Sequence, residues 1–124
     1  ANNSLVVRVH WGKTSFLFAG GLEKAGENEL IHRYKFDLAS NWLRAARSGS
    51  REASSAEFLQ LVSPDFAVIS VGAKNSSHYP HRETLERLGH LPLQLYRTDQ
   101  VSDRELIFSS DGKNVYPPGA QNTP

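Results

Sequence analysis

Apolar and polar positions along the chain change between strand-like and helix-like spacing. Residues 5–11 and 15–19 alternate apolar and polar side chains around a short glycine turn, which predicts a hairpin of half-buried strands. Residues 22–34 place apolar side chains among charged ones at helical spacing. Because Gly26 costs a helix interior about 1 kcal/mol relative to alanine, we expect that helix to begin late, near Glu27.

The most informative stretch is residues 41–71, which we interpret as strand, glycine loop, helix and strand. The loop is residues 47–50, and Ser54 or Ser55 can cap the helix that follows. A proline ends this helix, and residues 66–71 form a continuous apolar run typical of a strand buried on both faces. In open α/β sheets, sites form at the carboxyl ends of strands, so the loop is the first place to search for chemistry.

The second half of the chain continues the alternation. A polar loop over residues 72–81 leads into a helix over residues 82–88, with Pro80 in its first turn and Gly89 as its C-terminal cap. Two further short strands are expected over residues 93–97 and 105–109, followed by a frayed polar tail. Strands alternating with helices predict an α/β (α+β layered) fold with a mixed sheet and about three helices.

Composition limits the classes of function. The 124 residues suffice for one domain, and 39% hydrophobic residues are typical of a globular chain. The 14 Lys and Arg nearly balance the 13 Asp and Glu, which argues against a strong nucleic-acid footprint but leaves local patches open. No apolar run is long enough to cross a bilayer, so we expect a soluble domain. The lack of cysteine excludes disulfides and thiolate zinc sites, and the lack of methionine suggests a processed chain or a fragment.

The order of several segments resembles that in a known family. These segments are Asn-Asn-Ser-Leu-Val-Val-Arg-Val, Phe-Leu-Phe-Ala-Gly-Gly-Leu-Glu, Val-Ser-Pro-Asp-Phe-Ala-Val-Ile-Ser-Val-Gly and His-Arg-Glu-Thr-Leu-Glu-Arg-Leu. Together they resemble the C-terminal half of the metallo-β-lactamase-fold domain of ComEC-type DNA-internalisation competence proteins. The resemblance implies half, or a reduced version, of an αββα sandwich over residues 1–112, with a polar tail over residues 113–124.

The resemblance also implies that metal ligands are missing. In the family, the first half contains a His-x-His-x-Asp-His motif, and no part of this chain has that spacing. Gly21 stands at the position of a metal-bridging aspartate, Arg47 and Ser48 replace two histidines, and Tyr79 replaces another. A one-residue shift would let His78 substitute for the last. Glycine and arginine cannot bind a cation, so we expect no metal here, and zinc or manganese only in active relatives.

The same loops contain candidate groups for phosphate or DNA. They are Arg44, Arg47, Gly49, Ser50, Arg51, His78 and His81. Guanidinium groups and backbone amides suit phosphate, whereas the alternative is a solvated loop that replaces a lost metal charge. The two histidines could together bind a single metal ion, but we favour the interpretation in which they form hydrogen bonds to backbone. No residue is assigned a catalytic role.

Two smaller sets of residues have simpler interpretations. Trp11 and Trp42 could stack on bases, but large aromatic residues in strands usually belong to the core. Glu83, Glu86 and Arg87 read as the solvated face of a helix.

Three functions remain open from the sequence. The first is a degenerate metallo-β-lactamase-like domain related to DNA uptake, with a binding or structural role and DNA as a partner. The second is a metal-dependent nuclease or phosphodiesterase whose metal-binding first half is absent from this chain. The third is a small protein-interaction domain. The resemblance implies attachment to a larger bacterial inner-membrane protein that faces the periplasm or exterior. Half of a sandwich exposes one sheet face, which predicts a homodimer or a self-closed fold.

Overall fold

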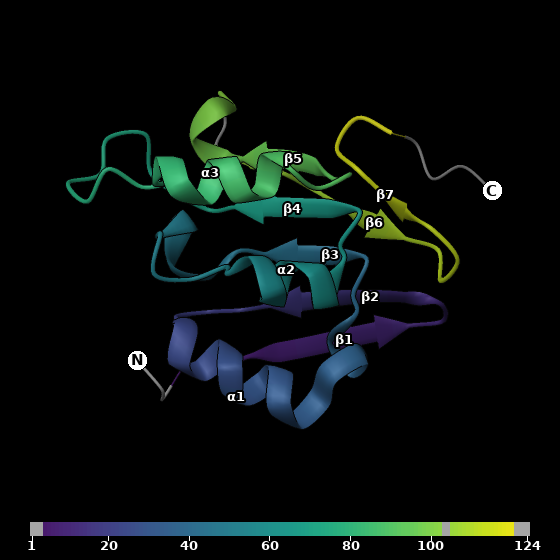
Figure 1. The fold of residues 1–124 in the computed structure, drawn as a ribbon. Coiled ribbons are helices and arrows are strands. Elements are labelled where there is room, and N and C mark those ends of the chain that lie inside the picture. The colour runs from purple at the N-terminus through teal and green to yellow at the C-terminus, as the bar shows by residue number, and fades with distance from the viewer. Residues whose placement is uncertain (1–3, 103–104, 121–124) are drawn as a thin grey trace.

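The computed structural model describes residues 4–102 and 105–120, and a five-stranded sheet forms its centre (Figure 1). The strands lie in the order β1 (Val7–Trp11), β2 (Thr14–Phe18), β3 (Trp42–Arg44), β4 (Phe66–Ile69) and β5 (Gln94–Arg97). β1 and β2 form the predicted antiparallel hairpin, and all later pairs are parallel. The mixed sheet agrees with the fold class predicted from the sequence.

Three helices connect the parallel strands and lie together in front of the sheet (Figure 1). They are α1 (Lys24–Tyr34), α2 (Ala56–Val62) and α3 (Arg82–Gly89), and each joins one parallel strand to its neighbour. Such crossovers are nearly always right-handed, so steps that all proceed in one direction across the sheet place every helix on the same face. Short 3-10 segments follow α1 (η1, Lys35–Leu38), β3 (η2, Ala46–Gly49) and β5 (η3, Thr98–Gln100).

The core lies between this face of the sheet and the helices. Leu17, Leu43 and Ala67 stand side by side in β2, β3 and β4, and each is at most 1% exposed. Phe58 and Leu59 of α2 pack into the same cluster with no more than 1% exposure. The apolar run predicted over residues 66–71 forms β4 only as far as Ile69. Three of the four β4 residues are buried and Phe66 is half-buried, in agreement with the predicted burial on both faces.

The boundaries of α2 follow local chemistry and agree with the prediction. The hydroxyl of Ser55 accepts a hydrogen bond of 3.3 Å from the Phe58 N–H and caps the helix. Ser63 ends the helix in a left-handed conformation with φ of 47°, immediately before Pro64.

The opposite face of the sheet is aromatic. Trp42 lies 5.0 Å from Phe18 and 5.9 Å from Phe108 between ring centroids, and Phe108 also contacts Phe66 and Tyr96. Phe108 precedes a small second sheet, formed by β6 (Ser109–Ser110) and β7 (Val115–Tyr116). The C-terminal segment therefore covers part of the face that has no helices.

Two expectations for the N-terminal half were wrong. α1 begins at Lys24 rather than near Glu27, and Gly26 and Glu27 are both buried within it. Tertiary contacts of this turn outweigh the cost of roughly 1 kcal/mol for a helical glycine. β1 is exposed at all five residues instead of half buried, because it forms the edge of the sheet. Trp11 is accordingly 57% exposed, whereas Trp42 is buried as predicted.

Differences in the C-terminal half are also local. His81 is the N-cap of α3, so Pro80 precedes the helix, and the C-cap is His90 rather than Gly89. The strand expected over residues 105–109 is reduced to β6. β7 lies within the stretch expected to be a polar tail. No helix in the described part of the chain is both long and apolar enough to span a bilayer.

Candidate functional site

Three connections meet at the carboxyl edge of β2, β3 and β4, on the left of Figure 1. The N–H of Arg47 donates a hydrogen bond of 2.9 Å to the Gly20 carbonyl, and the His81 N–H donates one of 3.0 Å to the Gly49 carbonyl. A Cβ atom on Gly49 would lie only 2.6 Å from Cβ of Pro80. Loops more than 25 residues apart therefore contact one another at the edge where we expected a site.

The middle loop has a strained backbone. Arg47 has φ of 50°, Ser48 has φ of 54° and Gly49 has φ of 86°. Only glycine adopts this left-handed region freely, and each other residue costs about 1–2 kcal/mol there. Such a turn persists only where its surroundings determine it, and strain of this kind is common at functional sites.

The three candidate arginines do not form one group. Arg47 Nη1 lies 3.7 Å from Glu23 Oε1, and Arg51 Nη1 lies 3.6 Å from Glu83 Oε2. Arg44 is exposed and points to the aromatic face, because its neighbour Leu43 points toward the helices. The site edge thus contains two of the three guanidinium groups predicted for it.

The paired histidines have separate roles. His81 Nδ1 accepts a hydrogen bond of 2.9 Å from the Arg51 N–H, and its Nε2 lies 3.1 Å from the Ser77 carbonyl. These contacts assign the proton of the His81 ring to Nε2. His78 is exposed in a left-handed conformation with φ of 57°. The hydrogen bonds of His81 link its loop to the Arg47–Gly49 turn.

The remaining candidate positions are enclosed or small. Tyr79 packs against the hydrophobic core, and its ring centroid lies 4.9 Å from that of His81. The Ser50 hydroxyl is buried and accepts a hydrogen bond from the Glu52 N–H. The turn after β2 requires glycine at Gly20, where φ is 58° and a Cβ would lie 2.6 Å from the Leu5 carbonyl oxygen. Gly21 has no such restriction, since its Cβ would have ordinary contacts.

The donor chemistry of this edge does not fit a hydrolytic metal site. Zinc or manganese centres require several nitrogen or carboxylate ligands around each ion. Within residues 4–102 and 105–120, no three His, Asp or Glu side chains come close enough to hold an ion together. Arg47 instead places a permanent cation at the edge.

Curated proteins with similar sequences have names that refer to competence or recombination. The chain is 32% identical over 119 residues to the ComE operon protein 3 of Bacillus subtilis, covering 94% of this chain and 15% of that protein. It is 36% identical over 96 residues to the competence protein ComA of Neisseria gonorrhoeae, covering 77% of this chain and 14% of ComA. The chain is related to ComEC-type competence proteins.

These similarities cover only a segment of each relative. The recombination protein 2 of Haemophilus influenzae is 34% identical over 88 residues, which are 70% of this chain and 11% of that protein. The chain therefore spans about a seventh, or less, of the length of these relatives. No protein-family model and no solved structure matches it.

Two residues near the site were missed by the sequence analysis. Glu27 of α1 is completely buried, and Arg87 of α3 donates to three backbone carbonyls. The expectation that Arg87 belongs to a solvated helix face was wrong, because its guanidinium turns toward residues 51–55. A charged residue in an amphipathic helix has no local signal for such a contact, since the partner lies about 30 residues away.

Proposed function

We propose that this chain is a metallo-β-lactamase-like domain without a hydrolytic centre that contributes to DNA uptake by contacting DNA rather than cleaving it. The relatives named as competence proteins support the coarse role. The main observation for the finer role is the edge at which three loops meet. At the positions where the family has metal ligands, this edge has Gly21, Arg47, Ser48 and Tyr79, and Arg51 lies beside them.

The absence of a carboxylate at Gly21 supports this proposal. The backbone there tolerates a side chain, because φ is not positive and the nearest atom to an added Cβ is the Ser4 Cβ at 3.4 Å. Glycine at this position is therefore not required by the turn. At position 47, a guanidinium would repel a divalent cation, but it suits a phosphate oxygen.

Phosphate can reach the two edge arginines at low cost. The ion pairs of Arg47 with Glu23 and of Arg51 with Glu83 are long and partly exposed, with distances of 3.7 and 3.6 Å. Exposed pairs of this kind contribute about 0–1 kcal/mol, so a phosphate can displace either carboxylate. Because the net charge of the chain is only +1, we expect weak DNA binding. Contacts to the phosphate groups of DNA carry no sequence information, so we expect no base selectivity.

The test measures DNA affinity against salt. Two or three phosphate contacts predict a loss in affinity between 50 and 200 mM salt of about ten- to fortyfold for duplex DNA and about seven- to twentyfold for single-stranded DNA, measured by fluorescence anisotropy. Arg47→Met and Arg51→Met should each remove one phosphate contact, so the slope of log affinity against log salt concentration should become about one unit less steep in each variant. Arg33→Met, an exposed site on α1, is the matched control and should change neither affinity nor slope. Equal slopes in the unmodified chain and in all three variants would refute DNA contact at this edge.

Metal analysis tests the non-hydrolytic part of the proposal. After exposure to zinc or manganese and dialysis, we expect substoichiometric metal by mass spectrometry. Two ions retained per chain would contradict it.

A second candidate is a metal-dependent nuclease or phosphodiesterase. The chain spans at most 15% of each relative reported above, so most of such a longer protein remains to supply metal ligands. This alternative predicts manganese-dependent cleavage of DNA by the longer protein and none by this chain. Neither DNA binding nor cleavage, together with capture of a protein partner, would instead favour an interaction domain.

A further inference from the structure

The segment between the strained turn and α2 is residues 51–55, and we call it the linker. It begins beside Arg47, since the Ser50 N–H donates a hydrogen bond of 3.0 Å to the Arg47 carbonyl. The Ala53 N–H then donates one of 3.2 Å to the Ser50 carbonyl. Backbone hydrogen bonds therefore connect the linker to the turn at the candidate site.

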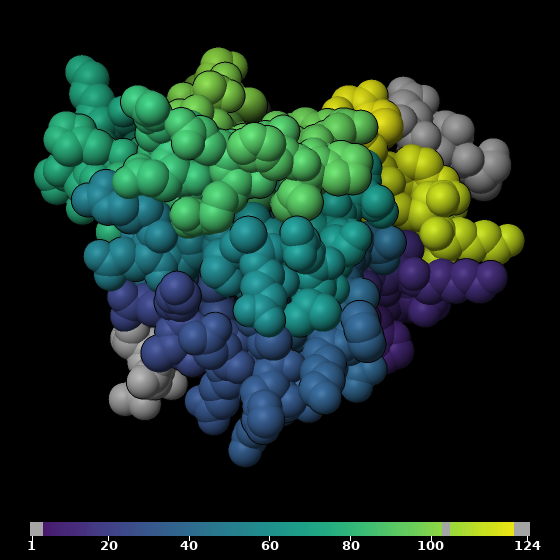
Figure 2. Space-filling model, in the orientation of Figure 1, coloured from purple at the N-terminus to yellow at the C-terminus, as the bar shows by residue number. Residues whose placement is uncertain are grey.

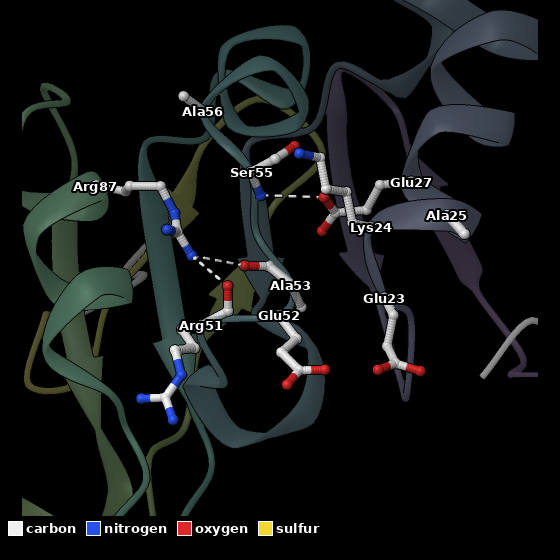
Figure 3. A pocket seen from close by; sticks show the side chains of 10 residues that line it. All are labelled: Glu23, Lys24, Ala25, Glu27, Arg51, Glu52, Ala53, Ser55, Ala56 and Arg87. Atoms are coloured by element: carbon white, nitrogen blue, oxygen red, sulfur yellow. Dashed lines mark hydrogen bonds between the residues drawn. The ribbon is translucent and has the colours of Figure 1, made fainter.

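Glu27 binds the linker from the side of α1. Its carboxylate accepts hydrogen bonds from the N–H groups of Ser54 and Ser55. The bond to Ser55 is 3.0 Å long and is drawn in Figure 3. Both amides lie just before the first turn of α2, where backbone donors have no helical partner. The buried carboxylate satisfies them and places its negative charge at the favourable end of the helix.

Arg87 binds the linker from the side of α3. Its Nε donates to the Ser54 carbonyl at 2.8 Å. Its Nη2 donates to the carbonyls of Ala53 at 2.9 Å and Arg51 at 3.1 Å, and Figure 3 shows these two bonds. A planar guanidinium presents several donors in a fixed geometry, which a lysine ammonium cannot reproduce. One side chain thus binds three backbone carbonyls of the linker.

The linker borders a hollow on the helix side of the molecule. A hollow of about 690 Å³ lies between α1 and α3 and is lined by charged side chains, including Glu23, Lys24 and Glu52. In Figure 2 this face of the molecule shows the blue atoms of α1 below, the teal atoms of α2 in the middle and the green atoms of α3 above. Because the linker borders this hollow, the hydrogen bonds from Glu27 and Arg87 determine its position together with the packing of Ala53 in the hydrophobic core.

We infer that Glu27 and Arg87 are positioning residues that clamp the linker and thereby hold the left-handed turn at Arg47–Gly49. The role of this clamp in DNA contact rests on the proposed function, whereas its effect on the turn does not. Glu27 accepts hydrogen bonds from backbone N–H groups of the linker, and Arg87 donates hydrogen bonds to backbone carbonyls of the same linker. In this inference, neither the Glu27 nor the Arg87 side chain contacts DNA.

Hydrogen exchange and amide NMR test the clamp without any ligand. Arg87→Met should lower the protection of the Ser54 and Ser55 amides at least tenfold and shift the Gly49 amide resonance. Glu27→Gln should act similarly, because its NH₂ group faces a backbone N–H. Arg82→Met, on the same helix with 89% side-chain exposure, is the control and should leave these signals unchanged. If Arg87→Met does not fold, Arg87→Lys is measured instead. Unchanged protection and an unchanged Gly49 resonance would overturn the inference.

DNA affinity then separates positioning from direct contact. Arg87→Met and Glu27→Gln should weaken binding about tenfold with an unchanged salt slope, whereas Arg47→Met should reduce the slope itself. A reduced slope for Arg87→Met would show direct phosphate contact and refute the positioning role. If the unmodified chain binds no DNA, the proposed function fails, and the NMR measurement still decides whether the clamp exists.

Discussion

At the residue scale, the candidate site depends on a glycine that no other residue can replace without movement. Gly49 combines φ of 86° with a position where an added Cβ would lie 2.6 Å from Pro80. The sequence showed a glycine in a loop, but the cause of its requirement is a second loop 30 residues away. The glycine therefore determines how closely the two loops approach.

Gly49→Ala is expected to destabilise the fold by about 1–3 kcal/mol, because both the backbone and the loop contact become unfavourable. Chemical denaturation measures this change in the free energy of unfolding. The control is Gly89→Ala at the end of α3, where no atom lies within 4 Å of the added Cβ. That variant should be neutral or slightly stabilised, and equal effects at both positions would contradict the argument.

Asp111 provides a pH-dependent contact in the turn between β6 and β7. Hydrogen bonds from the backbone N–H groups of Asn114 and Lys113, and then from the Tyr116 hydroxyl, lower the pKa of Asp111 below its ordinary value of 3.8. A lowered pKa means that the contribution to stability is complete above 3.8 and is lost as pH falls through the folded value. NMR titration should show the two amide resonances moving with the carboxyl group. Titration at or above pH 3.8 would contradict this.

At the scale of elements, α2 is the unit whose ends the sequence specified best. Its N-cap, its apolar face and its stop at Ser63-Pro64 all agree with the local pattern. α1 differs, because the buried contacts of Glu27 extend it to Lys24 despite the unfavourable Gly26. Local signals are sufficient where no distant contact competes with them.

Ser55→Ala should lower the free energy of unfolding by about 1 kcal/mol, since the Phe58 N–H loses its capping acceptor. Ser55→Asn retains a side-chain acceptor and should recover most of that stability in thermal or chemical denaturation. A loss of equal size in both variants would show that the cap is not the cause.

At the scale of the whole molecule, the C-terminal segment closes part of the second sheet face. Phe108 contacts the rings of Trp42, Phe66 and Tyr96 at 5.2–5.9 Å between centroids. Phe108→Ala should therefore destabilise the protein by about 2 kcal/mol, less than for a fully buried ring. Its neighbour Ile107 is 67% exposed, so Ile107→Ala should change stability by no more than about 0.5 kcal/mol. Similar losses in both variants would show that Phe108 does not close the face.

The uncovered part of this face lies along β1. Val7, Val9 and Trp11 alternate on one side of the strand and are 38%, 48% and 57% exposed. We call these three side chains the β1 strip. Whether the chain forms a homodimer through the β1 strip or is a self-closed monomer stays a prediction. Analytical ultracentrifugation of the chain distinguishes the homodimer from the monomer. A dimer that Val9→Glu dissociates would support the β1 strip as an interface, whereas a monomer at high concentration would exclude the homodimer.

By itself, the sequence determined the alternation of strands and helices, the β1–β2 hairpin, the limits of α2 and the burial of β4. These features follow from spacing, caps and prolines, which act over a few residues. The sequence also indicated the loop at residues 47–50 as the place to search, because it follows a parallel strand.

Only the tertiary structure decided which loops meet at that edge and what holds them. It separated Arg44 from Arg47 and Arg51, tied His81 to backbone and turned Arg87 toward the linker. It also exposed β1 by placing it at the sheet edge. Each of these outcomes joins groups far apart along the chain, so the order in which strands pack beside one another had to be known before local chemistry could assign a partner.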